Sequence, residues 1–424
     1  MGFSSEVEVM PETRSDDSEE ARIIFPRSLL ELSMLKRYLE GRLTYSASGE
    51  SITIVYFAKS TSVGPTSRYR IFQFLPILKE NGIKCIVHPL FDEQYWRILE
   101  IQSSLRRVIA KMAYVVGRFL RRAWDVLTIG DADLVVIEGQ LFPYMPALAE
   151  RMLARLRYRV VIELDDAIYL TRGHRWKIPA LLAIASGAIV GNEVLAQYAR
   201  RYAAQVFVVP TVVDTQRFVP VQRRGRLIGA ATEKPVTVVW IGLAYNLGYL
   251  NIVAPVLREL QDKGLIKFRV VCSRPPRLPG LMVEFRAWQL EQEVELLQDC
   301  HIGIMPLPNT EWAKGKCALK LLQYMSVGMA TVASPVGVNR EIISDGETGY
   351  LAVTEQDWRD RLAQLCQDAA FRERMGRAAR KTVEERYSLH VWGPRLAKQY
   401  QEITGNAISS HVSDSVTQPL SRHN

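Results

Sequence analysis

Two adjacent carboxylates, Asp165 and Asp166, directly follow the short apolar run at residues 160–163. A run of that kind predicts a buried strand, so both acids should lie at its carboxyl end, where open α/β sheets bind ligands. Paired carboxylates at such a place can position or deprotonate a hydroxyl group, or hold a divalent cation. The alternative is that one of the two only caps a helix beginning near Ala167.

Two lysines, Lys316 and Lys320, stand at the start of a second such unit. The apolar residues of 319–326 recur at helical spacing, Gly328 can end that helix, and residues 330–333 read as a buried parallel strand. A cation beside the start of a helix adds to the positive end of the helix dipole and suits a phosphate. An ordinary βαβ unit without a ligand is the alternative.

Two glycines occupy matching places after predicted strands. Gly64 follows the strand expected at residues 52–57, and Gly242 follows the strand expected at residues 236–240. A glycine there lets the backbone approach a ligand closely, although one alone more often marks only a tight turn. Arg68 and Arg70, just beyond Gly64, are candidates for a phosphate or hydroxyl-acceptor contact, or else solvated arginines at a helix start.

The composition is that of a globular protein with room for two domains. Of its 424 residues, 48% are hydrophobic and 23% are charged. The five cysteines are scattered without metal-ligand spacing, which favours reduced core residues in a cytoplasmic protein. We expect neither a signal peptide nor a membrane-spanning segment. The net charge of +9 lacks the basic runs interleaved with aromatics that would favour nucleic-acid binding.

The alternation of short apolar runs with helical sequence predicts two doubly wound parallel sheets. We expect a partly disordered N-terminal extension over residues 1–50, a first Rossmann-like domain over 51–220 and a second over 221–385. A helix over 386–404 should cross back to the first domain, and 405–424 should form a flexible tail. Ten strands are expected at residues 52–57, 84–87, 134–137, 160–163, 188–190, 206–209, 236–240, 268–271, 302–305 and 330–333, and another short strand is expected near Leu351.

Several ordered motifs together resemble a known family. The sequence KCALKLLQYM at residues 316–325, followed by VASPVGVNREI at 332–342, is similar to the nucleotide-sugar-binding half of family 4 retaining glycosyltransferases, which have the GT-B fold. It looks most like a bacterial subgroup. The resemblance extends over roughly residues 52 to 402 and includes GPTSRYR (64–70), ELDDAIY (163–169), GNE (191–193), PTVVD (210–214), WIG (240–242) and GIMPLP (303–308).

The resemblance implies an enzyme that moves a hexosyl group from a nucleotide-sugar donor to a hydroxyl acceptor with retention, in cell-surface polysaccharide or glycolipid assembly. We expect no metal and no cofactor besides the donor as co-substrate. From the positions of the residues and the resemblance together, we predict Asp165, Asp166, Lys316 and Glu341 as catalytic residues. The predicted donor contacts are Gly64, Gly242, Lys316, Lys320, Gln323, Asn339 and Glu341, and the predicted acceptor contacts are Arg68, Arg70, Asp166 and His174.

The sequence departs from the wider family at two places. Many members have two glutamates eight residues apart, and here Gly315 and Gln323 stand in their positions. Many also have an arginine and a lysine after the glycine that corresponds to Gly242, whereas LAYNLG follows here. We hypothesise that Lys316 supplies the missing charge. A non-catalytic GT-B scaffold or binding protein and a sugar-nucleotide epimerase remain as alternatives.

Residues 96–124 have helical periodicity with a basic face and an apolar face. The basic face holds Arg107, Lys111, Arg118, Arg121 and Arg122, and the apolar face holds Ile101, Leu105, Val108, Ile109, Met112, Val116 and Phe119. Such a helix suits an anionic membrane surface. Alternatively, its apolar face packs on the first domain's sheet with the arginines solvated. The lipid-linked acceptors common among similar enzymes favour contact with the inner face of the cell membrane.

Overall fold

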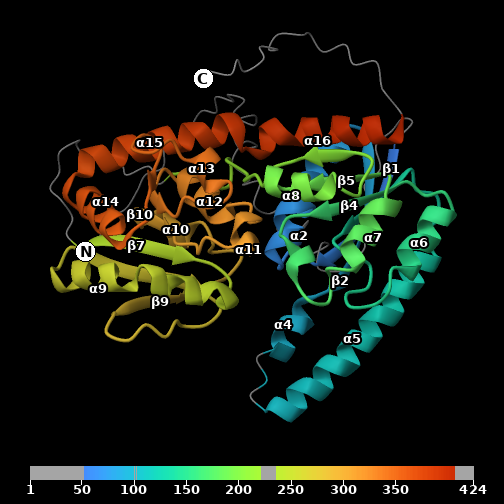
Figure 1. The fold of residues 1–424 in the computed structure, drawn as a ribbon, viewed down its shortest axis with the longest axis horizontal. Helices are drawn as coiled ribbons and strands as arrows, with labels where there is room; N and C mark the ends of the chain where they lie inside the picture. The colour runs from blue at the N-terminus through green and yellow to red at the C-terminus, as the bar shows by residue number, and fades with distance from the viewer. Residues whose placement is uncertain (1–51, 100, 102, 221–234, 406–424) are drawn as a thin grey trace, which may run out of the picture.

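The computed structural model describes residues 52–99, 101, 103–220 and 235–405. They form two α/β domains side by side, each built on a six-stranded parallel sheet (Figure 1). The predicted fold class, two doubly wound parallel sheets, is therefore confirmed. The predictions for residues 1–50 and for the tail beyond 405 lie outside the described residues.

The first sheet has the strand order β2-β1-β3-β4-β5-β6. Every residue of β3, β4 and β5 is buried, which is why these strands read as continuous apolar runs. Its strands are β1 (Ile52–Ser60), β2 (Ile83–Phe91), β3 (Leu134–Glu138), β4 (Val160–Leu164), β5 (Gly187–Val190) and β6 (Val206–Val208). Its helices include α2 (Pro65–Arg70), α3 (Leu75–Glu80), α6 (Leu148–Arg155), α7 (Lys177–Ile184) and α8 (Glu193–Ala199).

The second sheet has the order β12-β11-β10-β7-β8-β9. Its strands are β7 (Val236–Ile241), β8 (Ile266–Cys272), β9 (Val283–Ala287), β10 (Ile302–Met305), β11 (Ala330–Ala333) and β12 (Tyr350–Leu351). Its helices include α9 (Ala254–Asp262), α10 (Glu295–Gln298), α11 (Glu311–Lys314), α12 (Leu319–Ser326), α13 (Asn339–Ile342), α14 (Glu355–Gln367) and α15 (Ala369–Arg386). Strand β9 was not among the expected strands, because it is a half-exposed edge strand without a buried apolar run.

The last helix, α16 (Leu389–Thr404), packs on the first domain although it follows the second in sequence. Figure 1 shows α15 and α16 running along the top of the two domains in turn. The ring of Tyr400 on α16 lies edge-on to Tyr56 of β1, with centroids 6.2 Å apart. Arg159 donates a hydrogen bond of 2.7 Å to the carbonyl of Thr404. This helix therefore ties the end of the described chain to its beginning.

The amphipathic segment differs from the sequence prediction in two ways. It forms two helices, α4 (Glu93–Leu99) and α5 (Ser104–Leu127), rather than one. The apolar face of α5 points to solvent, so the alternative in which that face packs on the sheet is wrong. Eight apolar side chains of α5 are more than half exposed: Leu105, Val108, Ile109, Met112, Val116, Leu120, Trp124 and Leu127.

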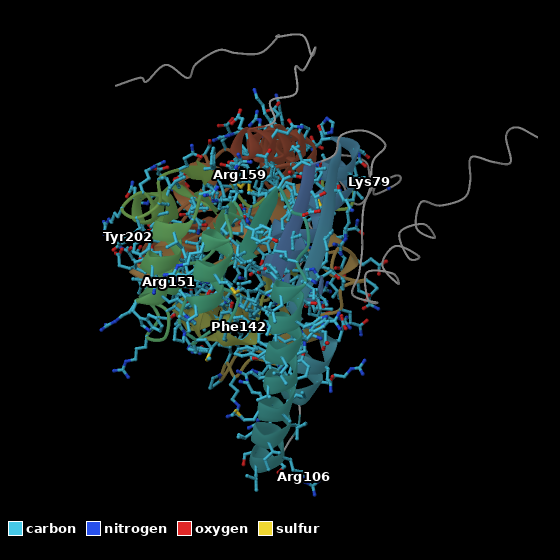
Figure 2. The ribbon with its side chains drawn as sticks, turned by 90° about the vertical axis from the view of Figure 1, so that its right-hand side faces the viewer. Lys79, Arg106, Phe142, Arg151, Arg159 and Tyr202 are labelled. Atoms are coloured by element: carbon cyan, nitrogen blue, oxygen red, sulfur yellow. The ribbon has the colours of Figure 1, made fainter. Side chains whose placement is uncertain are left out.

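The basic face of α5 attaches the helix to the domain. Arg118 donates hydrogen bonds of 2.6 and 2.7 Å to the carbonyls of Leu90 and Pro89 in β2. The buried Arg122 donates to the carbonyls of Ala58 and His88 at 2.7 and 2.9 Å. Figures 1 and 2 show the N-terminal half of α5 extending away from the domain. Packing through arginines leaves the apolar side of the helix uncovered.

The bonding and burial of the cysteines agree with the prediction that they are reduced core residues. None of the five forms a disulfide; four are buried and Cys317 is partly buried.

Candidate functional site

Charged side chains from the two domains meet at their junction. Asp166 follows β4 of the first sheet, and Lys316 precedes α12 of the second domain. The Lys316 Nζ atom lies 3.7 Å from Asp166 Oδ1. The sequence placed both residues in the site, and the structure brings them together. The helical cap considered for Asp165 or Asp166 is not formed, because the turn after β4 has Ala167 at its N-cap and no side-chain cap.

Burial opposes the charges of two of these groups. Burial and the nearby Asp165 raise the pKa of Asp166 to about 6, while Lys316, Lys59 and Lys320 act in the opposite direction. Burial and the neighbouring Lys316 lower the pKa of Lys320 to about 8. Between these two values both groups carry charge, so the junction holds a carboxylate and at least one ammonium group near neutral pH.

The absence of a side chain at Gly242 makes room for Lys320. A Cβ atom at position 242 would lie 2.6 Å from Lys320 Cε and 2.8 Å from the ring of Trp240. Lys320 Nζ lies 5.4 Å from the centroid of the Trp240 ring, and Lys316 Nζ lies 5.5 Å from that of Trp312. Both ammonium groups are within cation–π range of a tryptophan. The cation beside Gly242 is therefore Lys320 of α12, whereas Lys316, the residue expected there, lies beside Asp166 and Trp312.

Gly315 lies against the backbone of the first domain. A Cβ atom there would lie 2.7 Å from Ala167 Cβ and 3.1 Å from the Ala167 nitrogen. The side chain of Asn192 donates a 2.9 Å hydrogen bond to the Gly315 carbonyl, and Cys317 Sγ donates to the Asp165 carbonyl at 3.0 Å. The position has no space for a glutamate in this arrangement of the domains.

Gln323 belongs to a buried polar network between the domains. Its amide donates a 2.9 Å hydrogen bond to the hydroxyl of Tyr69, which donates to Glu293 Oε2 at 3.0 Å. Arg68 Nη2 lies 3.1 Å from Glu293 Oε1, and Trp288 donates to the same oxygen at 3.2 Å. The structure thus joins one residue expected to contact the donor, Gln323, with one expected to contact the acceptor, Arg68. Glu293 was not identified from the sequence.

Arg70 and Gly64 contact other parts of the first domain. Arg70 Nε is 2.5 Å from Glu163 Oε1, and its Nη1 donates to the Val209 carbonyl at 2.7 Å. Both side chains of this ion pair are buried. A Cβ atom at Gly64 would lie 1.8 Å from Ser60 Oγ, so the turn after β1 requires a glycine.

Asn339 and Glu341 lie on α13, after β11. Asn339 is buried and donates a 2.9 Å hydrogen bond to the carbonyl of Ser334, which fixes the loop between β11 and α13. Glu341 is exposed in the first turn of the same helix. The two residues therefore differ in availability to a ligand, and only the carboxylate faces solvent.

Two further charged residues of this region were not identified as site residues from the sequence. Lys59, near the end of β1, lowers the pKa of Asp166 and of His174 through its charge. Glu138, the last residue of β3, is buried, and accepts hydrogen bonds from Ser67 Oγ at 2.6 Å and the Lys59 N–H at 2.8 Å. Burial raises the pKa of Glu138 to about 7. Their position at the carboxyl ends of strands was the signal that could have identified them.

His174 lies in the loop before α7, with one ring nitrogen occupied. His174 Nδ1 is 2.7 Å from the amide nitrogen of Gln140. Because an amide nitrogen can only donate, Nδ1 is the acceptor and the proton of the neutral ring is on Nε2. Burial, Lys59 and Lys177 lower the pKa of His174, which favours this neutral form.

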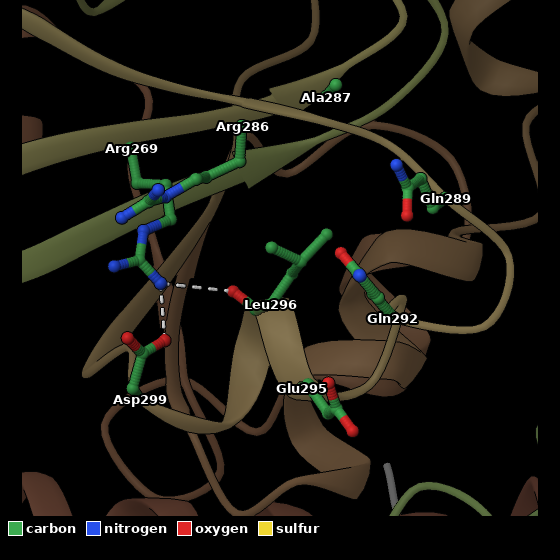
Figure 3. A pocket seen from close by; sticks show the side chains of 8 residues that line it. All are labelled: Arg269, Arg286, Ala287, Gln289, Gln292, Glu295, Leu296 and Asp299. Atoms are coloured by element: carbon green, nitrogen blue, oxygen red, sulfur yellow. Dashed lines mark hydrogen bonds and ion pairs between the residues drawn. The ribbon is translucent and has the colours of Figure 1, made fainter.

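A separate pocket of about 360 Å³ lies in the second domain beside β8, β9 and α10 (Figure 3). Its two arginines are already paired, since Arg269 contacts Asp299 and Glu284, and Arg286 contacts Glu284 at 2.6 Å. These carboxylates offset the positive charge that would attract a phosphate to this pocket. The junction of the two domains around Asp166, Lys316 and Lys320 is therefore the better candidate site. Within the described ranges, no three His, Cys, Asp or Glu side chains converge in a way that could hold a metal ion.

Residues 235–368, which make up most of the second domain, match the family model described as glycosyl transferases group 1. No curated protein matches the chain. Among the helices of the described residues, none has the length and apolar character required to cross a bilayer.

Solved structures match almost the whole described chain at low sequence identity. A glycosyltransferase from Rickettsia africae has 11% identity and a TM-score of 0.60, covering 85% of this chain and 100% of its own. Anabaena HepE in complex with UDP-glucose has 13% identity and a TM-score of 0.59, with coverage of 83% and 100%. Sucrose-phosphate synthase from Thermosynechococcus elongatus has 14% identity and a TM-score of 0.56, with coverage of 84% and 100%. The chain has the GT-B fold of these glycosyltransferases.

Proposed function

We propose that this protein is a retaining glycosyltransferase that moves a hexosyl group from a nucleotide-sugar donor to a hydroxyl acceptor. The observation that carries the proposal is the meeting of Lys316 and Lys320 of the second domain with Asp166 of the first. The match of the second domain to the group 1 glycosyl transferase model supports it.

The donor diphosphate would lie beside Lys316, Lys320 and Gly242. A leaving diphosphate gains negative charge as the glycosidic bond breaks, and preorganised cations stabilise that charge best where water is excluded. Lys316 lies 3.7 Å from Asp166, the charge of Lys320 also acts on that carboxylate, and Gly242 leaves space for Lys320. With these cations in place, we propose that transfer needs no metal ion.

Transfer would proceed on one face of the sugar. The acceptor oxygen forms a bond to the anomeric carbon on the face from which the diphosphate departs, and the bond between that carbon and the phosphate oxygen breaks. The acceptor's proton passes to the leaving phosphate. Asp166, and Asp165 beside it, would accept a hydrogen bond from the acceptor hydroxyl and orient it. Glu341, whose carboxylate is exposed, would contact the donor sugar.

A nucleotide panel tests the donor site. Purified protein is heated with UDP, GDP, ADP and TDP and their sugar conjugates; a ligand at 100 times its dissociation constant should add about 2.7 kcal/mol to the free energy of unfolding. We expect one nucleotide series to stabilise the protein, and Lys316→Ala and Lys320→Ala each to reduce the effect. Lys263→Ala, which changes an exposed lysine paired with Glu259 on the second domain, is the control.

Two outcomes would contradict this proposal. A folded protein that responds to no nucleotide would support the non-catalytic scaffold. Conversion of the donor to its epimer without any acceptor would support the epimerase.

We also propose that α5 places the enzyme on the inner face of the cell membrane, where a lipid-linked acceptor of polysaccharide or glycolipid assembly would be found. The outward face of α5 is apolar over its whole length, while Arg106 and Lys111 are exposed on the same helix. An amphipathic helix of this kind inserts its apolar face at the boundary between lipid headgroups and acyl chains, and basic residues favour anionic lipids.

Sedimentation with vesicles tests this contact. We expect the protein to sediment with vesicles of phosphatidylglycerol and phosphatidylcholine, and less with phosphatidylcholine alone. Met112→Glu, in the middle of the apolar face, should abolish sedimentation. Met282→Glu introduces the same charge at an even more exposed methionine of the second domain and should have no effect. Sedimentation of Met112→Glu at the wild-type level would contradict the proposal.

A further inference from the structure

Tyr144 holds an exposed aromatic ring on a strained backbone. The residue is 72% exposed, and its φ angle is 66°, in the left-handed region that favours glycine. A non-glycine residue in this conformation is strained and persists only where its surroundings hold it. Such strain is often found at ligand-binding positions.

The Tyr144 ring lies directly on a glycine. A Cβ atom at Gly173 would be 2.4 Å from one ring carbon of Tyr144 and 2.6 Å from another. The ring also lies against His174, with centroids 4.6 Å apart and planes inclined by 35°. One side of the tyrosine is therefore supported by residues 173–174, which leaves the rest of the ring to solvent.

The same histidine carries a directed hydrogen-bond donor. Because Gln140 donates to His174 Nδ1 at 2.7 Å, the Nε2–H group of His174 remains for another partner. Gln140 is 8% exposed and follows β3 by two residues, so a rigid strand fixes the orientation of the imidazole. The result is an aromatic face beside a fixed N–H donor.

This cluster has a charged neighbour in common with the junction, and a residue close to it in sequence contacts α5. The charge of Lys59 lowers the pKa of both His174 and Asp166, which places both groups within electrostatic reach of one lysine. On the other side, Phe142 packs edge-on against Phe119 of α5, with centroids 5.4 Å apart, and Figure 2 shows Phe142 beside that helix.

We propose that Tyr144, Gly173, His174 and Gln140 form a subsite for one sugar unit of a saccharide acceptor; the inference rests on the proposed glycosyltransferase function. The Tyr144 ring packs against the C–H face of a pyranose, because aromatic side chains combine an apolar face with a polar edge. His174 Nε2–H donates to a hydroxyl at the rim of that sugar. The next hydroxyl-bearing unit of the acceptor then extends toward Asp166.

Saturation-transfer NMR on the full chain tests the subsite directly. The probes are the methyl α-pyranosides of glucose, galactose, mannose and N-acetylglucosamine. We expect saturation of the ring protons of at least one probe by the wild-type protein, and at least a fivefold reduction in Tyr144→Ala. Tyr144→Phe, which keeps the ring, should retain the signal.

Two further variants separate the subsite from a general effect on folding. Gly173→Ala keeps the tyrosine but forces its ring away from the loop, so this variant should lose the signal as Tyr144→Ala does. Without ligand, at least one of these two variants should unfold at the same temperature as the wild type. Tyr202→Ala, at another surface tyrosine of the first domain, should bind the probes as the wild type does.

The nucleotide panel distinguishes failure of this inference from failure of the proposed function. Tyr144→Ala should keep the wild-type stabilisation by the donor nucleotide, because the subsite belongs to the acceptor. If the wild type responds to a nucleotide but none of the probes is saturated, or if Tyr144→Ala is saturated equally, the subsite is overturned and the transferase proposal stands. If saturation of nucleotide base protons is lost in Tyr144→Ala, the ring binds a base and the inference is also overturned.

Discussion

Asp166 and Lys320 carry opposite charges at the domain junction, and burial opposes both. With pKa values of about 6 and about 8, the carboxylate is lost to protonation below pH 6 and the ammonium to deprotonation above pH 8. We therefore expect kcat/KM for transfer to be bell-shaped between these limits. Measurement from pH 5 to 9 checks this, and Lys320→Arg should move the upper limb to higher pH while the lower limb stays. If Lys320→Arg leaves the upper limb of the pH profile unchanged, that limb reports the titration of another group.

The space at Gly242 has a measurable role of its own. Gly242→Ala places a methyl group 2.6 Å from Lys320 Cε, so it should displace the lysine and raise the donor KM about tenfold, which corresponds to about 1.4 kcal/mol. Gly248→Ala is the matched control, because a Cβ atom there meets nothing within 4 Å. Equal donor KM values for the two variants would show that the position of Lys320 does not matter for donor binding.

Glu138 links protonation to stability. Burial raises its pKa to about 7, so the folded state binds a proton more tightly than the unfolded chain does. The stability that follows is present below about pH 4.5 and is lost as the pH rises through 7, by up to about 3 kcal/mol. The urea midpoint of Glu138→Gln minus that of the wild type should therefore be larger at pH 8 than at pH 5. An unchanged difference between the two pH values would contradict this assignment.

At the scale of elements, α5 is attached through its arginines. Removing Arg118 breaks hydrogen bonds to two carbonyls of β2, which we expect to weaken the attachment by about 1–3 kcal/mol and speed amide exchange along α5 accordingly. Hydrogen exchange of Arg118→Ala measures this, and Arg106→Ala, at an exposed arginine of the same helix, is the control. Exchange in α5 at the same rate in both variants would mean that other contacts hold the helix.

The sequence predicted ten of the strands because buried parallel strands are continuous apolar runs. It missed β9, whose exposed edge position needs no such run. It predicted an amphipathic helix near α5, but periodicity shows only that two faces differ and says nothing about which one packs. The apolar face was the obvious one to bury, and here arginine contacts to β2 carbonyls take its place.

The sequence likewise identified the site residues that a local pattern marks and missed their partners that are distant in sequence. Asp166, Lys316 and Lys320 were identified because they stand at the ends of strands or helices, where local pattern is informative. The partners of Gln323 and Arg68 are Tyr69 and Glu293, distant in sequence, and no local pattern could have paired them.

At the scale of the whole molecule, the network around Glu293 holds the domains together. Its carboxylate receives hydrogen bonds from Arg68 and Tyr69 of the first domain, and removing it leaves a buried arginine unpaired, at a cost of about 3–5 kcal/mol. We expect Glu293→Ala to lower the urea midpoint and to increase the radius of gyration in small-angle scattering. Glu293→Gln, which keeps the shape and one acceptor oxygen, should show a smaller change. If Glu293→Ala keeps the wild-type radius of gyration, contacts other than the Glu293 network hold the two domains together.

The contact between Gly315 and Ala167 also limits which changes this sequence tolerates one at a time. A glutamate at position 315 would clash with Ala167 of the first domain. Replacing Gly315 alone is therefore expected to be harmful, whatever the new carboxylate would add to the chemistry. Position 315 and the loop at residues 165–167 form one unit for engineering, because each sets the space that is open to the other.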